Sequence, residues 1–242
     1  MFNHIKILSF LFFLSISLIA SAQQTVISKN TLPKRIQATY EVTKNGQPFA
    51  KVHELFVATE NVYKIESITK GVGVYALFGE RQLTSVGDVT AQGLKPTRFE
   101  LHQGSNAKRS LSADFDWAKQ NLIMTVKGQP KEAPLAQGTQ DLASYAYQFM
   151  FLPAPLKDAI TVSLTTGKKL NQYQYRINVE PEMIDSAGAS YKTLHLAPSE
   201  QNNTETKELW LAVEYYYVPV RILMVDDHGQ KLEQTLIELY VE

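Results

Sequence analysis

Two acidic residues in one alternating segment are the first positions in this chain where paired side-chain chemistry can be considered. Asp114 and Asp116 are two residues apart, so on a β-strand their carboxylates share one face at about 6–7 Å. Inverting glycosidases hold two carboxyl groups roughly 6.5–9.5 Å apart, on opposite sides of a sugar. Neighbours on a single strand face cannot flank a sugar in that way. We therefore interpret this pair as part of a solvated strand face.

Patterns of metal ligands are equally weak. The sequence Asp226-Asp227-His228-Gly229 contains suitable ligand types, but it separates two predicted strands and ends in glycine, as a hairpin turn does. The other histidines after residue 22 have no second ligand at helical spacing; they are His53, His102 and His195. We expect no metal site.

Motifs for a nucleophile or a cofactor are missing from the sequence. No G-x-S-x-G elbow occurs, and Ser85 and Ser105 lack the strand-turn-helix setting that exposes a nucleophile. Gly71-Val72-Gly73 lacks the third glycine of a dinucleotide-binding loop. The chain has no cysteine, which excludes thiol catalysis, disulfides and thiolate metal sites. We expect a non-enzymatic protein with no catalytic residue and no cofactor.

Charge argues against a nucleic-acid partner. The chain has 24 basic and 24 acidic residues and a formal net charge of zero. Binding to nucleic acid needs a basic stripe or patch, whereas the basic clusters here are short and lie beside turns, at Lys108-Arg109 and Lys168-Lys169.

The elements that would position any site are predicted to be strands. From Arg35 onward, apolar and polar residues mostly alternate between turn signals such as Asn45-Gly46. This pattern predicts a mainly β fold of about a dozen short strands in a curved antiparallel sheet or half barrel. The clearest predicted strands cover residues 35–42, 49–59, 62–69, 111–117, 122–126, 160–164, 173–179, 191–196, 209–213, 218–225 and 232–241.

Two segments interrupt the alternation. Residues 140–151 place apolar side chains at helical spacing, with Thr139 or Asp141 available to cap the start and Pro153 to end it. We predict one helix there, packed on the concave face of the sheet. Glycines surround a very apolar core in residues 71–79, which fits a short helix, a bulged strand or a mobile flap.

The chain is predicted to contain a cleaved leader and a single domain. Lys6, the apolar run from Ile7 to Ala20 and the sequence Ala20-Ser21-Ala22 are typical of a secretory signal over residues 1–22. A membrane anchor is the alternative, but the run is shorter than the roughly 20 residues that span a bilayer. Residues 23–34 are expected to be a flexible segment and 35–242 one β-rich domain. Residues 129–137 are the best linker candidate, yet neither half has enough strands to close alone.

Some predicted strands are apolar on both faces. Leu209, Leu211 and Val213 point one way, while Trp210 and Ala212 point the other. Either this is a central strand covered on both sides, or the sheet is curved around an apolar pocket.

Three blocks of sequence, taken in order, resemble a known family. They are Gly93-Leu94-Lys95-Pro96 with Phe99 and Phe115-Asp116-Trp117, then residues 140–144, and then Leu209-Trp210-Leu211 with residues 218–222. Their order and spacing resemble the DUF3108 family of exported proteins from Gram-negative bacteria, a family without an established activity. The last block is also similar to LolA-like proteins. That resemblance implies a half barrel that curls around a helical lid and holds acyl chains.

Fold and resemblance together lead to an expected function. We expect a soluble periplasmic protein that binds an apolar envelope ligand, a lipid or a lipidated partner, on its concave sheet. The expected lining residues are Tyr75, Leu77, Phe78, Trp117, Leu142, Tyr145, Phe149 and Trp210. The alternative is an envelope assembly or glycan-interaction module acting through a sheet edge and aromatic residues. A hydrolase using Asp114 or Asp116 is the third hypothesis. No nucleic acid and no stable membrane anchor are expected.

Overall fold

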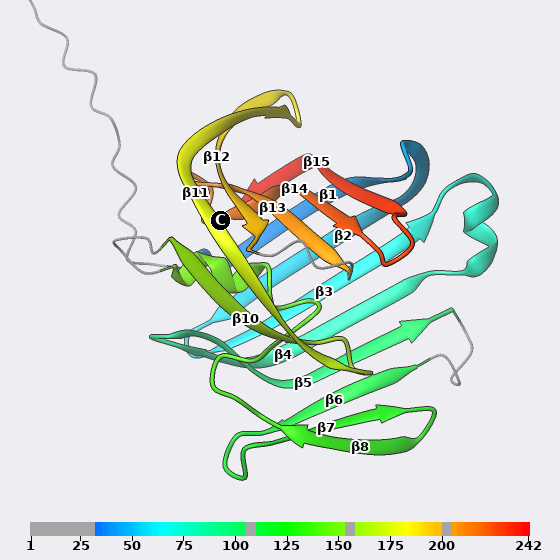
Figure 1. Ribbon diagram of the computed structural model, residues 1–242, viewed down its shortest axis with the longest axis vertical. Coiled ribbons are helices and arrows are strands. Elements are labelled where there is room, and N and C mark those ends of the chain that lie inside the picture. Colours follow the sequence, from blue (N-terminus) through cyan, green and yellow to red (C-terminus); the bar gives the residue numbers. More distant parts are fainter. Residues whose placement is uncertain (1–31, 105–109, 153–157, 200–204) are drawn as a thin grey trace, which may run out of the picture. The chain divides into compact units, whose positions relative to one another are not determined.

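The described part of the molecule is one curled β-sheet. A computed structural model describes residues 32–104, 110–152, 158–199 and 205–242. Leu32–Glu242 forms one compact unit, and its strands belong to a single 15-stranded sheet (Figure 1). The mainly β fold predicted from the sequence is confirmed. The predicted leader, residues 1–22, and most of the segment 23–34 lie outside the described residues.

The strands follow one another along the sheet as a long meander. Their spatial order is β8-β7-β6-β5-β4-β3-β2-β1-β15-β14-β13-β12-β11-β10-β9. Every pairing between neighbours is antiparallel except β9 with β10. The elements are β1 (Arg35–Lys44), β2 (Gln47–Thr59), β3 (Val62–Gly71), η1 (Gly73–Phe78), β4 (Arg81–Thr90), β5 (Gly93–Gln103), β6 (Leu111–Asp116), β7 (Asn121–Val126), β8 (Gln129–Pro134), β9 (Gln140–Asp141), η3 (Tyr147–Phe151), β10 (Ala159–Thr165), β11 (Leu170–Ser186), β12 (Ala189–Pro198), β13 (Thr206–Ala212), β14 (Val218–Val225) and β15 (Lys231–Val241).

The first and last strands meet in the middle of this order. Ile36 pairs with Val241 and Lys44 with Leu232 in an antiparallel ladder. Beyond the strands, the backbone N–H of Lys34 donates to the carbonyl of Glu242 at 2.7 Å. Each wing of the sheet is therefore built from one continuous half of the chain, and the β1–β15 ladder joins the two wings.

The wings also touch across the concave side. Gly167 lies in the turn between β10 and β11, where a Cβ atom would sit 2.3 Å from Leu111 Cδ1 and 3.1 Å from Phe99 Cε1. The hydroxyl of Thr165, at the end of β10, donates to Met124 Sδ at 3.3 Å. The β10–β11 turn therefore packs directly on side chains of β5, β6 and β7.

Side chains fill much of the concave face. Alternating residues of β1, such as Ile36 and Tyr40, are fully buried there. Buried residues form three apolar clusters, and their largest fully buried aromatic side chains are Tyr40, Tyr147, Tyr175, Phe56, Phe99 and Phe149. Most of the alternating apolar residues in the sequence are therefore part of the hydrophobic core.

The packed helical segment is shorter than predicted over residues 140–151. Gln140–Asp141 forms β9 beside β10, turns follow, and only Tyr147–Phe151 forms the 3-10 helix η3. Asp141 does cap the first turn, because its carboxylate accepts from the backbone N–H of Ala143 at 2.8 Å and of Ser144 at 2.9 Å. Since the ladder occupies the first two residues of the segment, helical geometry begins only after them.

The structure differs from the sequence prediction in three further segments. Residues 129–137 are not a linker, because Gln129–Pro134 is β8, a terminal strand of the sheet. Pro130 and Pro134 suit such an edge position. Strands β4 and β5 were missed, because Ser85 and Gly87 occupy buried positions of β4 and Pro96 lies within β5. A register shift between Val86 and Gly87 accommodates that proline.

Candidate functional site

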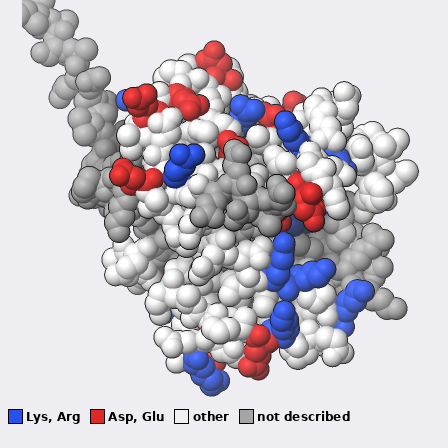
Figure 2. Space-filling view, in the orientation of Figure 1, with Lys and Arg blue, Asp and Glu red and all other residues white. Residues whose placement is uncertain are grey.

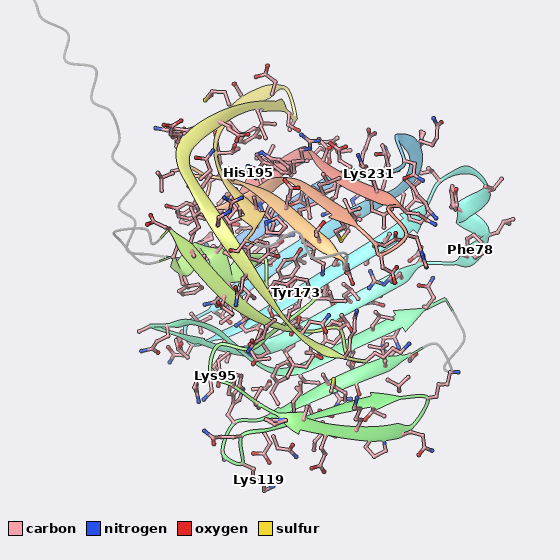
Figure 3. The ribbon with its side chains drawn as sticks, in the orientation of Figure 1. Phe78, Lys95, Lys119, Tyr173, His195 and Lys231 are labelled. Carbon is pink, nitrogen blue, oxygen red and sulfur yellow. The ribbon has the colours of Figure 1, made fainter. Side chains whose placement is uncertain are left out.

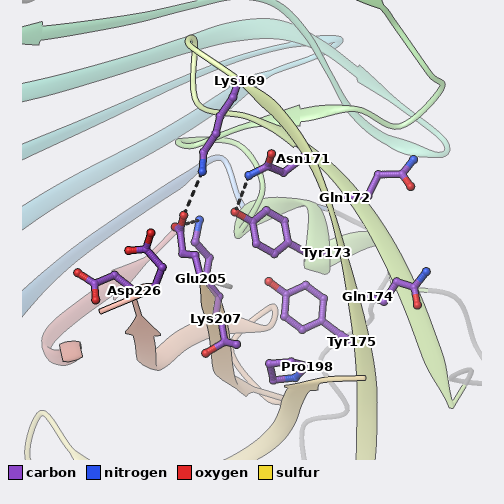
Figure 4. A pocket seen from close by; sticks show the side chains of 12 residues that line it. Lys169, Asn171, Gln172, Tyr173, Gln174, Tyr175, Pro198, Glu205, Lys207 and Asp226 are labelled. Carbon is purple, nitrogen blue, oxygen red and sulfur yellow. Dashed lines mark hydrogen bonds and ion pairs between the residues drawn. The ribbon is translucent and has the colours of Figure 1, made fainter. Parts of the chain in front are cut away.

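A cleft lies between β11, β13 and the turn from β14 to β15 (Figure 4). Its volume is about 750 Å³, within the range of ligand pockets in proteins. Polar and charged side chains dominate its lining, which consists of Lys169, Asn171, Gln172, Tyr173, Gln174, Tyr175, Pro198, Glu205, Thr206, Lys207, Asp226 and Asp227.

Strand alternation aims three side chains of β11 at the interior of this cleft. Asn171, Tyr173 and Tyr175 point toward Lys207, whereas Gln172 and Gln174 point the other way (Figure 4). The rings of Tyr173 and Tyr175 stack with centroids 6.5 Å apart. The amide of Asn171 donates to the Tyr173 hydroxyl at 3.4 Å. The hydroxyl of Tyr175 is buried and makes no hydrogen bond to any described residue, so it is a donor without a partner.

A buried lysine forms the floor of the cleft. Lys207 is only 3% exposed, and its ammonium lies 4.9 Å from the ring centroid of Tyr173 and 5.6 Å from that of Tyr145. Such cation–π contacts partly replace lost hydration. Burial nevertheless lowers the pKa of the Lys207 ammonium below its usual range. The cation–π contacts therefore make up for only part of the hydration that the Lys207 ammonium loses on burial.

Glu205 is the carboxylate next to this cation. Its Oε1 lies 3.7 Å from Lys207 Nζ, and its Oε2 accepts a hydrogen bond from Lys169 Nζ at 3.4 Å. One carboxylate therefore serves two ammonium groups. Both distances are longer than the roughly 2.7–2.9 Å of a strong charge-assisted hydrogen bond.

The two aspartates on the rim are engaged in their own turn. Asp226 Oδ1 accepts from the backbone N–H of His228 at 2.9 Å and of Gln230 at 2.8 Å. Gly229 completes the turn with a φ of 74°. The hairpin turn predicted for Asp226-Asp227-His228-Gly229 is confirmed, and its polar groups hold the turn together.

A second group of polar side chains surrounds Glu54 on β2. The Glu54 carboxylate accepts from the hydroxyl of Tyr147 at 3.1 Å and of Ser67 at 3.2 Å. Burial raises the pKa of Glu54 to about 6, although these two hydrogen bonds oppose the shift. The Glu54 carboxyl group therefore ionises less readily than a carboxyl group in water.

This shift predicts how stability changes with pH. A folded-state pKa above the unfolded one means that stability is complete below about pH 4.5 and declines as pH rises through 6. We expect Glu54→Gln to be about 2 kcal/mol more stable than the parent at pH 8, and nearly equal to it at pH 4. Urea unfolding at both pH values measures this. The control is Glu60→Gln, in an exposed turn; equal gains in the two variants would contradict the prediction.

The residues predicted to line an apolar site do not line the cleft. Tyr145 and Phe149 belong to one buried cluster and the partly buried Leu142 packs against it. Tyr145 reaches the cleft through its contact with Lys207. Trp117 packs against a different cluster and donates to the Pro96 carbonyl at 2.6 Å.

Trp210 lies on the opposite face of β13 from Leu209 and Leu211. Its ring stacks on His195 with centroids 4.3 Å apart, and the guanidinium of Arg221 lies 4.7 Å from the ring centroid. This strand is therefore covered on both sides, as the simpler of the two sequence interpretations proposed.

The remaining predicted lining residues belong to η1. Residues 71–79 contain a short helix, one of the three predicted forms, and Leu77 and Phe78 are 88% and 63% exposed. Figure 3 places Phe78 at the outer margin of the molecule, away from Tyr173 in the cleft. Tyr75 packs on Phe49 with centroids 4.6 Å apart. These three residues share one surface segment that does not join the cleft.

The acidic pair and the serine near glycine have partners within the fold. Asp114 pairs with Arg98 and Asp116 with Lys119. The face of the molecule drawn in Figure 2 carries charges of both signs. Ser85 is buried and donates to Asp141 at 2.6 Å, while Ser105 lies outside the described residues. Within the described ranges, no group of three or more His, Cys, Asp or Glu side chains is placed to hold a metal ion.

One residue of the cleft, Lys207, could have been recognised from the sequence. Lys207 is in phase with Leu209 and Leu211, so strand alternation places a charged residue on the buried face of β13. A lysine at such a position needs a partner. The other cleft residues lie in strands whose proximity to β13 is not evident from spacing.

By its fold and its cleft, this is a β protein built on one open, curled sheet with a polar cleft on the concave side. The chain belongs to the family described as Protein of unknown function (DUF3108), whose model matches residues 36–236. A search among curated proteins found no match. Within the ranges that the structure describes, no helix is long and apolar enough to cross a membrane.

Proposed function

We propose that this protein is an exported, non-enzymatic binding protein of the cell envelope, and that its cleft binds a segment of a glycan. The observation that carries the proposal is the lining of the 750 Å³ cleft, where amide, hydroxyl and charged groups surround two tyrosine rings. Sugars offer hydroxyl groups to such polar side chains and an apolar ring face to aromatic ones. The export address in residues 1–22 supports a location in the envelope.

An apolar ligand is the second candidate, favoured by the cluster directly behind the cleft. Phe149 meets Tyr175 edge-on with centroids 6.5 Å apart, and Leu142 packs against the same cluster. A lipid chain could therefore extend from the cleft toward apolar side chains. Fully buried aromatic residues already occupy that space, so an acyl chain would have to displace them.

Titration of the purified protein with defined probes separates these candidates. The glycan probes are chitotetraose, a neutral galactan tetramer and tetragalacturonate, and the apolar probe is a fluorescent fatty acid. We expect saturable binding of at least one oligosaccharide, weakened roughly tenfold by Tyr173→Ala, since loss of an aromatic platform costs about 1.4 kcal/mol or more. The control is Tyr240→Ala, at an exposed position of β15. Saturable binding of the fatty acid alone would overturn the glycan proposal.

A further inference from the structure

Two ammonium groups in the cleft share one carboxylate. Lys169 is exposed and Lys207 is buried, and Glu205 lies between them at 3.4 and 3.7 Å. Each lysine has three donor hydrogens. A single carboxylate at these distances leaves most of those donors without an acceptor among the described residues.

The shortage of hydrogen-bond acceptors is more unfavourable for Lys207 than for Lys169, because Lys207 is buried. Moving an ammonium group out of water is unfavourable unless charges and hydrogen bonds in the protein compensate it. The aromatic rings of Tyr145 and Tyr173 supply only part of that compensation. The neighbouring Tyr175 hydroxyl is a further buried donor, and no residue in the described ranges accepts a hydrogen bond from it. Around Lys207 and Tyr175, the described residues therefore supply fewer acceptors than these two buried side chains have donors.

We propose that the cleft recognises a carboxylate on its ligand, and that the carboxylate of Glu205 occupies the place where the ligand carboxylate binds. The proposal rests on the proposed function and names its ligand class: an acidic saccharide of the uronate type. An incoming carboxylate accepts hydrogen bonds from Lys169, Lys207 and Tyr175 and displaces Glu205 toward the open side of the cleft.

The other acidic residues do not take part in this exchange. Asp226 is held by two backbone N–H groups of its turn, and Asp227 lies on the exposed rim with His228. Glu205 is the acidic side chain that contacts both lysines. Removing its charge is therefore the change that should favour a competing carboxylate.

A carboxylate can come from a sugar or from a fatty acid. An acidic saccharide also has hydroxyl groups for Asn171 and a ring face for Tyr173, both of which face the cleft (Figure 4). A fatty acid has the same headgroup but a chain without polar atoms. Both sources are included in the test.

The test measures the affinities of tetragalacturonate, a neutral galactan tetramer and a long-chain fatty acid by calorimetry. We expect the protein to prefer tetragalacturonate over the neutral tetramer. Lys207→Met should reduce that preference at least about tenfold, the scale of one lost charge-assisted hydrogen bond. Glu205→Gln should increase affinity for tetragalacturonate several-fold and leave the neutral tetramer unchanged. Methionine fits an apolar strand face, so the variant is expected to fold.

Lys168→Met is the matched control, because Lys168 is exposed and does not line the cleft. If Lys207→Met and Glu205→Gln leave the preference for tetragalacturonate unchanged, the inference is wrong, although binding of either tetramer would still support the glycan function. If only the fatty acid binds, and Lys207→Met weakens it, the lysines do recognise a carboxylate, but the saccharide ligand class and the glycan function are both wrong. Binding of neither carboxylate probe also overturns the inference.

Discussion

Replacing Asp141 with alanine is expected to lower the free energy of unfolding by about 4 kcal/mol. The fully buried carboxylate of Asp141 accepts hydrogen bonds from the Ser85 hydroxyl at 2.6 Å and from the backbone N–H groups of Ala143 and Ser144. Alanine leaves the two buried backbone donors without acceptors and removes one of the two hydrogen bonds of Ser85, whose other partner is the Tyr63 hydroxyl. Each buried donor left without an acceptor costs about 1–3 kcal/mol. Urea unfolding at pH 7, followed by circular dichroism, measures the difference.

Asparagine at the same position separates the hydrogen bonds from the charge. Its carbonyl oxygen can accept from the same backbone donors, so Asp141→Asn should cost less than the alanine variant. Burial raises the pKa of Asp141 to about 6, so the parent should lose stability as pH rises from about 4 through 6, and the asparagine variant should lose less. Asp116→Ala, at an exposed ion pair, should change stability only slightly. A cost as small for Asp141→Ala would contradict this account.

Replacing Gly87 with valine is expected to cost about 3 kcal/mol or more and to reduce the yield of folded protein. A Cβ atom on Gly87 would lie 2.3 Å from the Lys95 carbonyl oxygen and 2.7 Å from Pro96 Cα. Both atoms belong to the backbone of β5, so relief requires the two strands to separate rather than a side chain to rotate. Overpacking of this kind typically costs 1–3 kcal/mol, occasionally more.

Gly128→Ala is the comparison for this prediction. Gly128 has a φ of 76°, and its surroundings are open, since no heavy atom lies within 4 Å of its Cβ position. Only the left-handed backbone is then penalised, by about 1 kcal/mol. Thermal and urea unfolding of both variants give the comparison, and a smaller cost at Gly87 than at Gly128 would show that β5 can move away freely.

Strand patterning was predictable because alternation survives in most of this sheet. Ile36, Ala38, Tyr40 and Val42 all face the core, as their spacing predicts. Prediction failed where small or polar residues face inward, as Ser85 does, and where a bulge accommodates Pro96. It also failed at residues 140–151, because helical spacing does not show that the first two residues belong to a ladder.

The cleft was harder to predict than the fold. An apolar pattern reports which side chains are buried, but it cannot distinguish a filled core from an empty pocket. The alternation of β13 predicts that Lys207 faces the core. It does not predict the ring contacts of Lys207, because Tyr145 and Tyr173 come from distant segments of the chain. Export and the identity of a ligand remain predictions.

The ladder between β1 and β15 also has a consequence for the order of folding. Asn45 Oδ1 accepts from the backbone N–H of Lys231 across a separation of 186 residues, whereas most other pairings join strands that are close in sequence. Local hairpins can form rapidly, but closing so long a loop carries a high entropic cost. We therefore expect the two wings to assemble first and the ladder last. Until then, β1 presents an unpaired edge that is open to intermolecular pairing.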